Sequence, residues 1–211
     1  MKPLTAIVLA MFIFGAPVAA QSLMLDCTGS MANPEKVEAG VVTAIANATP
    51  IVITFDVSLF SASPLSAPAH TVAVNRQGGR SRIEYVNKGR EAQLRDDIKG
   101  RLEALLATGR PEPASITNLA AALLRAAEMH PALVVTDGKD ETGKLPVRLQ
   151  SGLNVFVILC PAKGDNPARE IETFEARKRV VVRMLPEAAV FGCYQTQRAV
   201  QAWASRANSS R

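Results

Sequence analysis

An acid and two hydroxyls stand at alternate positions directly after a short apolar run near the start of the chain. The segment Leu23–Met31 reads LMLDCTGSM, and its oxygens belong to Asp26, Thr28 and Ser30. Gly29 lets the backbone turn tightly where the run stops, so these oxygens can point into one small volume. Oxygen ligands suit Mg²⁺ or Ca²⁺, whereas zinc prefers histidine and cysteine. The segment therefore predicts one part of a site for a hard divalent cation.

Two segments further along the chain carry the same kind of oxygen. Thr117 stands just before a run rich in alanine and leucine, in the sequence SITNLAAA. Its residue type suits an ordinary helix N-cap equally well. Asp137 follows the apolar run of PALVVTDG, and an aspartate before glycine is common in the turn after any strand. Taken alone, each of these two segments is explained by ordinary local structure, a helix cap or a turn. Only the combination of all three segments indicates a shared site.

In this combination the chain resembles the von Willebrand factor type A (vWA) domain. DCTGS fits the family pattern Asp-x-Ser/Thr-x-Ser, and the other two segments are similar to the next metal-site segments in the same order. The resemblance implies a metal-ion-dependent adhesion site that binds Mg²⁺, or Ca²⁺ or Mn²⁺. It also implies a protein partner with an exposed Asp or Glu, and a binding module rather than an enzyme. The residues that it assigns to the metal are Asp26, Thr28, Ser30, Thr117 and Asp137.

Electrostatics favour a cation at these residues. Two facing carboxylates repel each other, and a divalent cation between them removes the repulsion. The three hydroxyls are neutral ligands, so an ion held by Asp26 and Asp137 stays electron-poor and attracts a carboxylate from outside. The nearby acids Asp140 and Glu141 could shape the loop after Gly138, and we expect them instead to be exposed and solvated.

A phosphoryl-transfer enzyme is the main alternative. DCTGS is also similar to the Asp-x-Thr-Gly-Thr start of haloacid dehalogenase-type enzymes, in which the aspartate, here Asp26, is the nucleophile. In those enzymes the hydroxyl of the second motif ends a strand, whereas Thr117 precedes a helix. They also need a downstream lysine and a paired acid motif, which the sequence does not place cleanly. A serine hydrolase is disfavoured because the chain has no Gly-x-Ser-x-Gly segment. A scaffold that has lost its metal is disfavoured by the complete set of oxygen ligands.

The N-terminus predicts export. Residues 1–20 combine Lys2, an apolar stretch too short to span a bilayer comfortably and a small-residue cleavage signal ending at Ala20. This pattern is typical of a secretory signal peptide, and an uncleaved anchor is the alternative. We expect a periplasmic or secreted protein without a membrane span after cleavage.

The cysteines are consistent with an oxidising compartment. Three cysteines in an exported chain leave one outside any pair. Cys160 ends one apolar run and Cys193 follows another, and we expect these two to form a disulfide. Cys27 lies inside the first oxygen-rich segment, with its side chain alternating away from the site, and we expect a buried thiol.

Composition excludes two other classes of protein. The chain has 211 residues, a net charge of +5 and 48% hydrophobic residues, which is enough for one domain with a core and not typical of disorder. Basic residues between positions 76 and 90 are followed closely by acids, as on a solvated mixed-charge face. With one tryptophan and two tyrosines, a stacking surface for nucleic acid is not expected.

Apolar runs alternate with helical patterns along the chain. This order predicts a doubly wound, mostly parallel sheet with helices on both faces and an antiparallel edge strand or hairpin, formed by 70–75 and 81–86. Ligands bind such sheets at the carboxyl ends of strands, where the strand order reverses. We expect one domain at 21–206, followed by a frayed tail at 207–211. The expected strands are 22–25, 51–55, 132–136, 153–159 and 180–185, and the expected helices are 35–46, 90–108, 118–129, 145–150, 168–177 and 194–206. Asp56 is expected to cap the loop after the second strand.

Overall fold

The computed structural model describes residues 21–48, 54–60, 70–73, 88–109, 117–128, 131–140 and 152–209. Three expected features lie outside these ranges: the signal peptide at 1–20, the second hairpin arm at 81–86 and the helical piece at 145–150. None of the helices in the described ranges is both long and apolar enough to cross a membrane.

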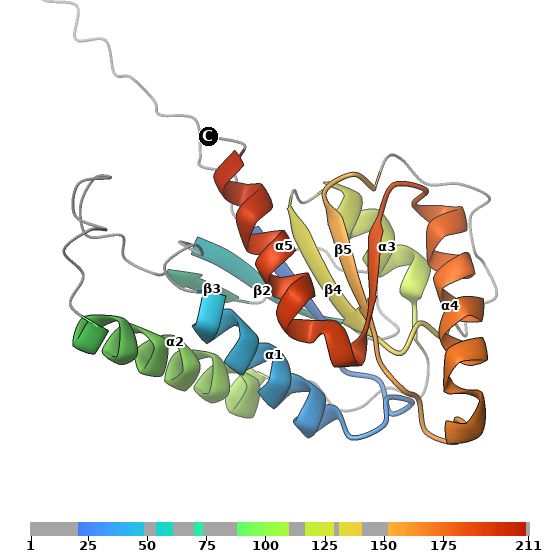
Figure 1. Ribbon diagram of the computed structural model, residues 1–211, viewed down its shortest axis with the longest axis horizontal. Coiled ribbons are helices and arrows are strands. Elements are labelled where there is room, and N and C mark those ends of the chain that lie inside the picture. The colour runs from blue at the N-terminus through green and yellow to red at the C-terminus, as the bar shows by residue number, and fades with distance from the viewer. Residues whose placement is uncertain are drawn as a thin grey trace, which may run out of the picture.

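Six strands of the described chain form one sheet in the order β3-β2-β1-β4-β5-β6. Strands β1, β2, β4, β5 and β6 are parallel, and β3 pairs antiparallel with β2. The order reverses at β1, which has β2 on one side and β4 on the other (Figure 1). The predicted doubly wound α/β fold is confirmed. The strands are β1 (Gln21–Asp26), β2 (Thr54–Phe60), β3 (His70–Ala73), β4 (Ala132–Thr136), β5 (Val155–Leu159) and β6 (Ala189–Gly192).

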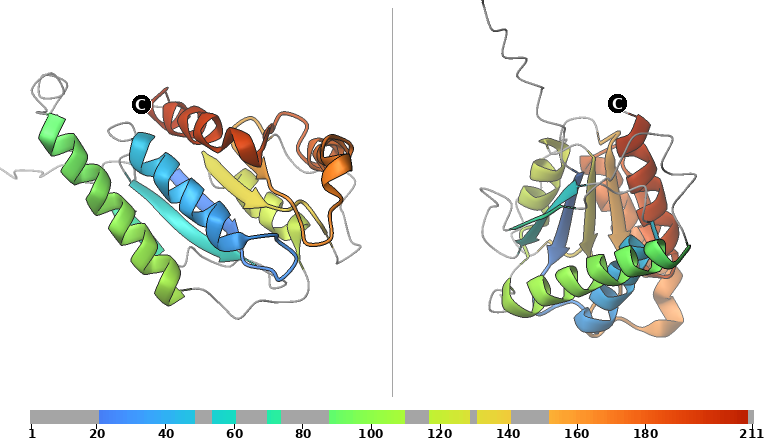
Figure 2. Two further views of the ribbon diagram at one scale, coloured as in Figure 1. Left: turned by 60° about the horizontal axis from the view of Figure 1, so that its bottom comes forward. Right: turned by 90° about the vertical axis from the view of Figure 1, so that its left-hand side faces the viewer.

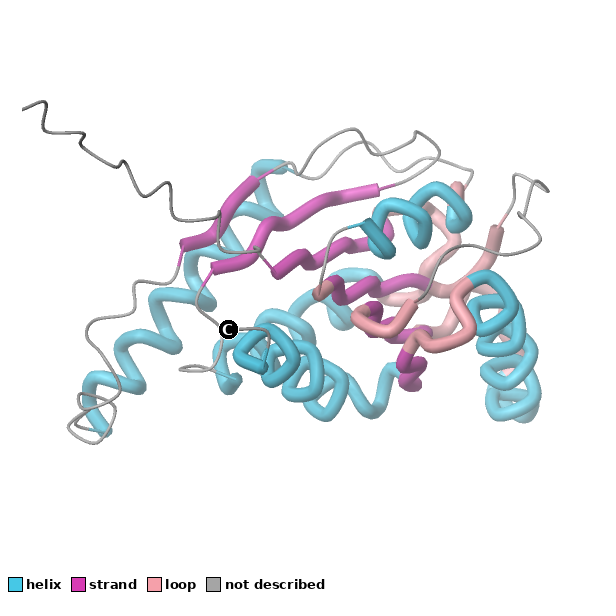
Figure 3. Tube along the Cα trace, turned by 90° about the horizontal axis from the view of Figure 1, so that it is seen from above, coloured by secondary structure: helices cyan, strands magenta, loops and turns pink. Residues whose placement is uncertain are grey.

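Helices cover both faces of the sheet. Helices α1, α2 and α5 pack on one face, and α3 and α4 pack on the other. The right-hand view of Figure 2 shows α3 and α5 on opposite sides of the strands, and Figure 3 shows the strands between helices from above. The helices are α1 (Pro34–Ala48), α2 (Lys88–Gly109), α3 (Leu119–Glu128), α4 (Glu170–Met184) and α5 (Thr196–Ser209), with short 3₁₀ turns η2 (Pro167–Arg169) and η3 (Cys193–Gln195).

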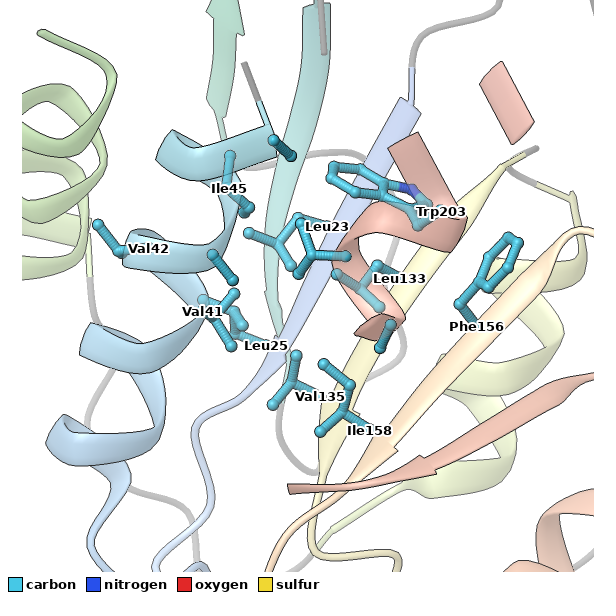
Figure 4. Close-up of a cluster of buried hydrophobic side chains, with 14 of the residues drawn as sticks. Leu23, Leu25, Val41, Val42, Ile45, Leu133, Val135, Phe156, Ile158 and Trp203 are labelled. Carbon is cyan, nitrogen blue, oxygen red and sulfur yellow. The ribbon is translucent and has the colours of Figure 1, made fainter. Parts of the chain in front are cut away.

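Strand β1 is the central strand of the fold and every residue in it is buried. Because successive side chains of a strand point to opposite faces, Leu23 and Leu25 pack with α1 and α5, whereas Met24 packs with α3. Figure 4 shows the first of these clusters, with Trp203 of α5 over the same face. Burial on both faces fixes the register of β1, because a shift by one residue would exchange the two faces. That register determines where Asp26 emerges at the end of the strand.

The apolar segment 180–185 forms the end of helix α4, which runs to Met184 with Leu185 as its C-cap, so the strand predicted there is wrong. Val181, Met184 and Leu185 lie at helical spacing and are buried against the face that α3 also covers. The strand in this region is β6, which begins at Ala189. A short apolar run rich in valine fits either element from its composition, and here the end of α4 uses it to reach the core.

Strand β2 is longer than predicted and shifted along the chain. It continues to Phe60, so Asp56 pairs with Ser22 of β1 and does not cap a loop as expected. Residues 51–53, where we expected this strand to begin, lie outside the described residues. At the other end of the chain, α5 continues to Ser209, past the expected end of that helix.

The predicted disulfide between Cys160 and Cys193 is confirmed. The two Cα atoms are 4.7 Å apart, although the residues are separated by 33 positions in sequence. The bond joins the residue after β5 to the first residue of η3, which follows β6. Cys27 is buried and is not part of a disulfide, as expected.

Candidate functional site

Strands β1 and β4 bring the oxygen-rich segments to one edge of the sheet. They are parallel neighbours, with Leu25 of β1 beside Val135 of β4. Asp26, the last residue of β1, and Thr136, the last residue of β4, therefore lie next to each other at the carboxyl edge. This is the point at which the strand order reverses, the usual ligand site of a doubly wound sheet.

Hydrogen bonds connect four of the five predicted site residues. Asp26 Oδ1 accepts from the backbone N of Thr28 at 2.9 Å and from Thr28 Oγ1 at 2.7 Å. The hydroxyls of Thr28 and Ser30 are 2.9 Å apart. Thr117 Oγ1 donates to Thr28 Oγ1 at 3.0 Å. The hydroxyl before α3 thus reaches the segment after β1.

The helix-cap explanation of Thr117 was the alternative, and other residues cap α3. Asn118 Oδ1 accepts from the backbone N of Ala121 at 3.0 Å, and Asp140 Oδ1 accepts from the backbone N of Leu119 at 3.1 Å. These acceptors satisfy first-turn donors of α3 that lack a partner inside the helix. Thr117 is fully buried and directs a hydrogen bond to Thr28.

Asp137, the fifth predicted residue, is fully buried beside this network. Its Oδ1 accepts from the backbone N of Lys139 at 2.9 Å. Its Oδ2 is also buried and has no hydrogen-bond partner among the described residues. A buried carboxylate oxygen without a partner is costly, and a bound cation would satisfy it. The donor set therefore fits a hard cation.

The electrostatics of Asp26 agree with a concentration of negative charge. Burial raises the pKa of Asp26 above its usual range, and hydrogen bonds from Thr136 and Thr28 only partly oppose this effect. The charge of Asp137 raises the pKa of Asp26 further, so the two carboxylates interact although they share no hydrogen bond. In the described ranges, the site included, no three His, Cys, Asp or Glu residues gather in a group that could hold a metal ion, so the candidate site depends on two carboxylates and on hydroxyls.

Sequence reasoning missed the role of Thr136. Its Oγ1 donates to Asp26 Oδ2 at 2.6 Å and accepts from the backbone N of Gly138 at 3.0 Å. One hydroxyl thus ties the end of β1 to the turn after β4. The signal was present in the TDG sequence, where the threonine precedes the acid.

Asp140 was predicted to be solvated, and this is wrong. It is half-buried and caps α3 through the hydrogen bond to Leu119, which fixes the turn after β4 against the segment that carries Thr117. Since the acid and the helix that it caps come from different parts of the chain, no local spacing reveals the contact. Glu141, for which the same was predicted, lies outside the described residues.

Comparison with known proteins finds similar solved structures but no similar sequences. No protein-family model matches this sequence, and neither does any curated protein. An aerotolerance-related membrane protein from Bacteroides fragilis NCTC 9343, crystallised with multiple mutations to serines, is similar in structure with a TM-score of 0.51 and 14% identity. The match covers 90% of this chain and 99% of that one. The chain has a vWA-like fold.

Two more distant structures are also similar. Manganese-loaded TRAP protein from Plasmodium vivax has a TM-score of 0.41 and 14% identity, over 89% of this chain and 74% of that one. The pilus adhesin SpaC from Lactobacillus rhamnosus GG has a TM-score of 0.37 and 14% identity, over 90% of this chain and 30% of that one.

The first prediction concerns Gly138, which has a φ of +73°. A Cβ there would lie 2.8 Å from Leu159 Cδ2, so Gly138→Ala should lower the free energy of unfolding by roughly 1–3 kcal/mol in urea denaturation. Gly40→Ala is the matched control, because a Cβ at that helical position meets nothing within 4 Å. The control should gain about 0.5–1 kcal/mol. Equal effects of the two substitutions would show that the turn does not need glycine.

The second prediction concerns the charge of Asp26. Because the pKa of Asp26 is raised in the folded protein, protonation of Asp26 stabilises the folded state. This stabilisation is fully present below pH 3.8, the ordinary pKa, and is lost as the pH rises through the pKa of the folded protein. Asp26→Asn imitates the protonated form and should melt at a higher temperature than wild type at pH 7 in the presence of chelator. The difference should narrow as the pH falls toward 3.8. Thermal melts at several pH values test this, and a lower melting temperature of the variant at pH 7 would contradict it.

Proposed function

We propose that this chain is an exported domain that binds a protein partner through a divalent cation. The residues proposed to hold the cation are Asp26, Thr28, Ser30, Thr117 and Asp137. The observation that supports this most is the meeting of oxygens from three segments at one edge of the sheet, beside an Asp137 Oδ2 that lacks a hydrogen-bond partner among the described residues.

The chemistry of these donors favours Mg²⁺, with Mn²⁺ or Ca²⁺ as substitutes, because each binds oxygen ligands. Two carboxylates balance the charge of the ion, and the hydroxyls of Thr28, Ser30 and Thr117 add dipoles without further charge. An ion in such surroundings keeps its attraction for one more anionic oxygen. The proposed partner supplies that oxygen from an exposed Asp or Glu.

Export is supported by the disulfide between Cys160 and Cys193, since such bonds persist in oxidising compartments. The proposed location is the periplasm or the extracellular space. The expected signal peptide, residues 1–20, gives the same interpretation from the sequence.

The hydrogen bonds of Asp26 restrict the alternative function, phosphoryl transfer. A nucleophilic aspartate needs an oxygen free to attack. Here Oδ1 accepts two hydrogen bonds from Thr28 and Oδ2 accepts one from Thr136. Oδ1 therefore has both of its lone pairs engaged and Oδ2 keeps one, so attack on a phosphate would be confined to Oδ2.

The third prediction is that Mn²⁺ or Mg²⁺ raises the melting temperature of the wild type. At about 100 times the dissociation constant the ion should add about 2.7 kcal/mol to the free energy of unfolding. Asp137→Ala should abolish this increase, because it removes the carboxylate with the unpartnered oxygen. Asp96→Ala, at an exposed position of α2, should respond like wild type. A wild type that does not respond to either ion would refute the metal site.

The fourth prediction concerns the partner. Wild-type protein used as bait should retain a partner from the exported proteome in Mg²⁺ and release it in chelator. The Asp137→Ala bait should retain little of it under either condition. Acidic residues of the recovered partner can then be replaced one at a time, and one Asp or Glu should be indispensable. A partner held equally well in chelator would argue for a metal-independent surface.

A further inference from the structure

We propose that the ion pair between Asp165 and Arg177 positions the two halves of the proposed metal site. The inference rests on the proposed function and concerns residues outside the five that would hold the cation. Asp165 lies in the loop between β5 and η2, and Arg177 lies in α4. Neither residue is singled out by a sequence motif.

The geometry of this pair differs from that of ordinary surface pairs. Arg177 Nη1 donates to Asp165 Oδ2 and Nη2 donates to Oδ1, both at 2.7 Å, so the guanidinium binds the carboxylate through both of its oxygens. The side chains are only 14% and 20% exposed. The hydrogen bonds from Arg177 hold the pKa of Asp165 below its usual range. By contrast, the Lys178–Glu175 pair joins neighbours on one helix, at 3.4 Å and with both side chains 40% or more exposed. A bidentate, half-buried pair between separate elements restricts their relative movement.

One end of the pair connects to the segment that carries Ser30. Asp165 Oδ2 also accepts from the backbone N of Ala162 at 2.7 Å. Ala162 forms an isolated antiparallel bridge with Met31, the residue after Ser30. On the two sides of this bridge, the backbone N of Lys163 donates to Ser30 O at 2.7 Å and the backbone N of Ala32 donates to Pro161 O at 2.9 Å. Asp165 therefore orders a short loop that is hydrogen-bonded directly to the proposed metal segment.

The other end of the pair connects to the turn that carries Asp137. A Cβ placed on Gly138 would lie 3.3 Å from Arg177 Cβ and 3.4 Å from Arg177 Cδ, so the aliphatic part of the arginine lies against this glycine. Gly138 follows Asp137 directly. The stem of Arg177 thus contacts the turn after β4. Its guanidinium binds Asp165, in the loop that is hydrogen-bonded to the Ser30 segment.

This double contact matters because the two halves of the site repel each other. Asp26 ends β1 and Asp137 follows β4, and both carboxylates are buried. A pair that fixes both segments keeps their oxygens in one arrangement, so less of the binding energy of a cation is lost in ordering them. Residues that orient metal ligands from outside typically change metal affinity by about ten- to a hundredfold when they are replaced.

The test uses two variants that separate the ion pair from other contacts. Arg177→Met keeps an aliphatic stem against Gly138 and removes the guanidinium. Asp165→Asn keeps an oxygen for the backbone N of Ala162 and removes the charge. Titration with Mn²⁺, followed by the electron paramagnetic resonance signal of the free ion, should show affinity reduced about tenfold or more in both variants. Hydrogen exchange at the amides of Ala32 and Lys163 should be faster in the metal-free variants than in wild type.

Two controls exclude nonspecific effects. Lys178→Met breaks the neighbouring Lys178–Glu175 pair on the same helix and should leave Mn²⁺ affinity unchanged. Trp203→Phe removes the 3.1 Å hydrogen bond from Trp203 Nε1 to Pro131 O and should lower the melting temperature without weakening Mn²⁺ binding. A loss of affinity in Trp203→Phe equal to that in Arg177→Met would reduce the effect to general destabilisation and overturn the inference.

The remaining outcomes distinguish the two proposals. If the wild type binds Mn²⁺ and both Arg177→Met and Asp165→Asn bind it equally well, the positioning role is overturned and the metal site stands. If the wild type takes up no Mn²⁺, the proposed function itself fails, and the positioning role fails with it.

Discussion

Two carboxylates buried at the ends of neighbouring strands impose the main physical constraint on this molecule. Asp26 and Asp137 are held out of water, close enough for the charge of one to raise the pKa of the other. Burial of like charges opposes folding unless hydrogen bonds or a counter-ion compensate for it. The hydroxyls of Thr28 and Thr136 provide part of this compensation at Asp26. Asp137 Oδ2 receives no such bond from the described residues, which makes this edge of the sheet suited to a cation.

The rest of the fold holds these groups in place. Two clusters of apolar side chains, one on each face of the sheet, include residues of both β1 and β4, so packing in the core fixes the ends of both strands. Outside the core, contacts between loops complete the arrangement. Asp140 ties the turn after β4 to α3, and the disulfide ties the end of β5 to the start of η3. Cys160 also donates its backbone N–H to Thr136 O at 2.9 Å, so the disulfide is connected to β4, the strand that ends just before Asp137.

The sequence predicted the parts of this structure that have a local pattern. Short apolar runs end at Asp26 and Thr136, and the alternation of such runs with helical patterns was enough for the fold class. The resemblance carried by the oxygen-rich segments correctly predicted that Thr117 lies near Thr28, while the cation itself stays a prediction.

What the sequence did not predict depends on contacts between distant segments or on ambiguous periodicity. The helix around Val181 was predicted as a strand because a short apolar run fits both elements, and the packing of α4 on the sheet decides between them. The capping of α3 by Asp140 joins two parts of the chain, and so does the pairing of Asp165 with Arg177. Neither contact leaves a spacing that can be recognised along the chain.

The direction of the strands has a consequence for how the domain is attached. Strand β1 begins at the edge of the sheet opposite to Asp26, and α5 returns to that same edge, where Arg206 Nε donates to Asn154 Oδ1 at 2.8 Å just before β5 begins. Figure 1 shows the end of α5 near that edge, remote from the carboxyl ends of the strands. Both ends of the described domain therefore lie at the edge of the sheet opposite to the carboxyl ends of the strands. If either end were attached to a neighbouring domain or to a surface, Asp26 and Asp137 would face away from the point of attachment.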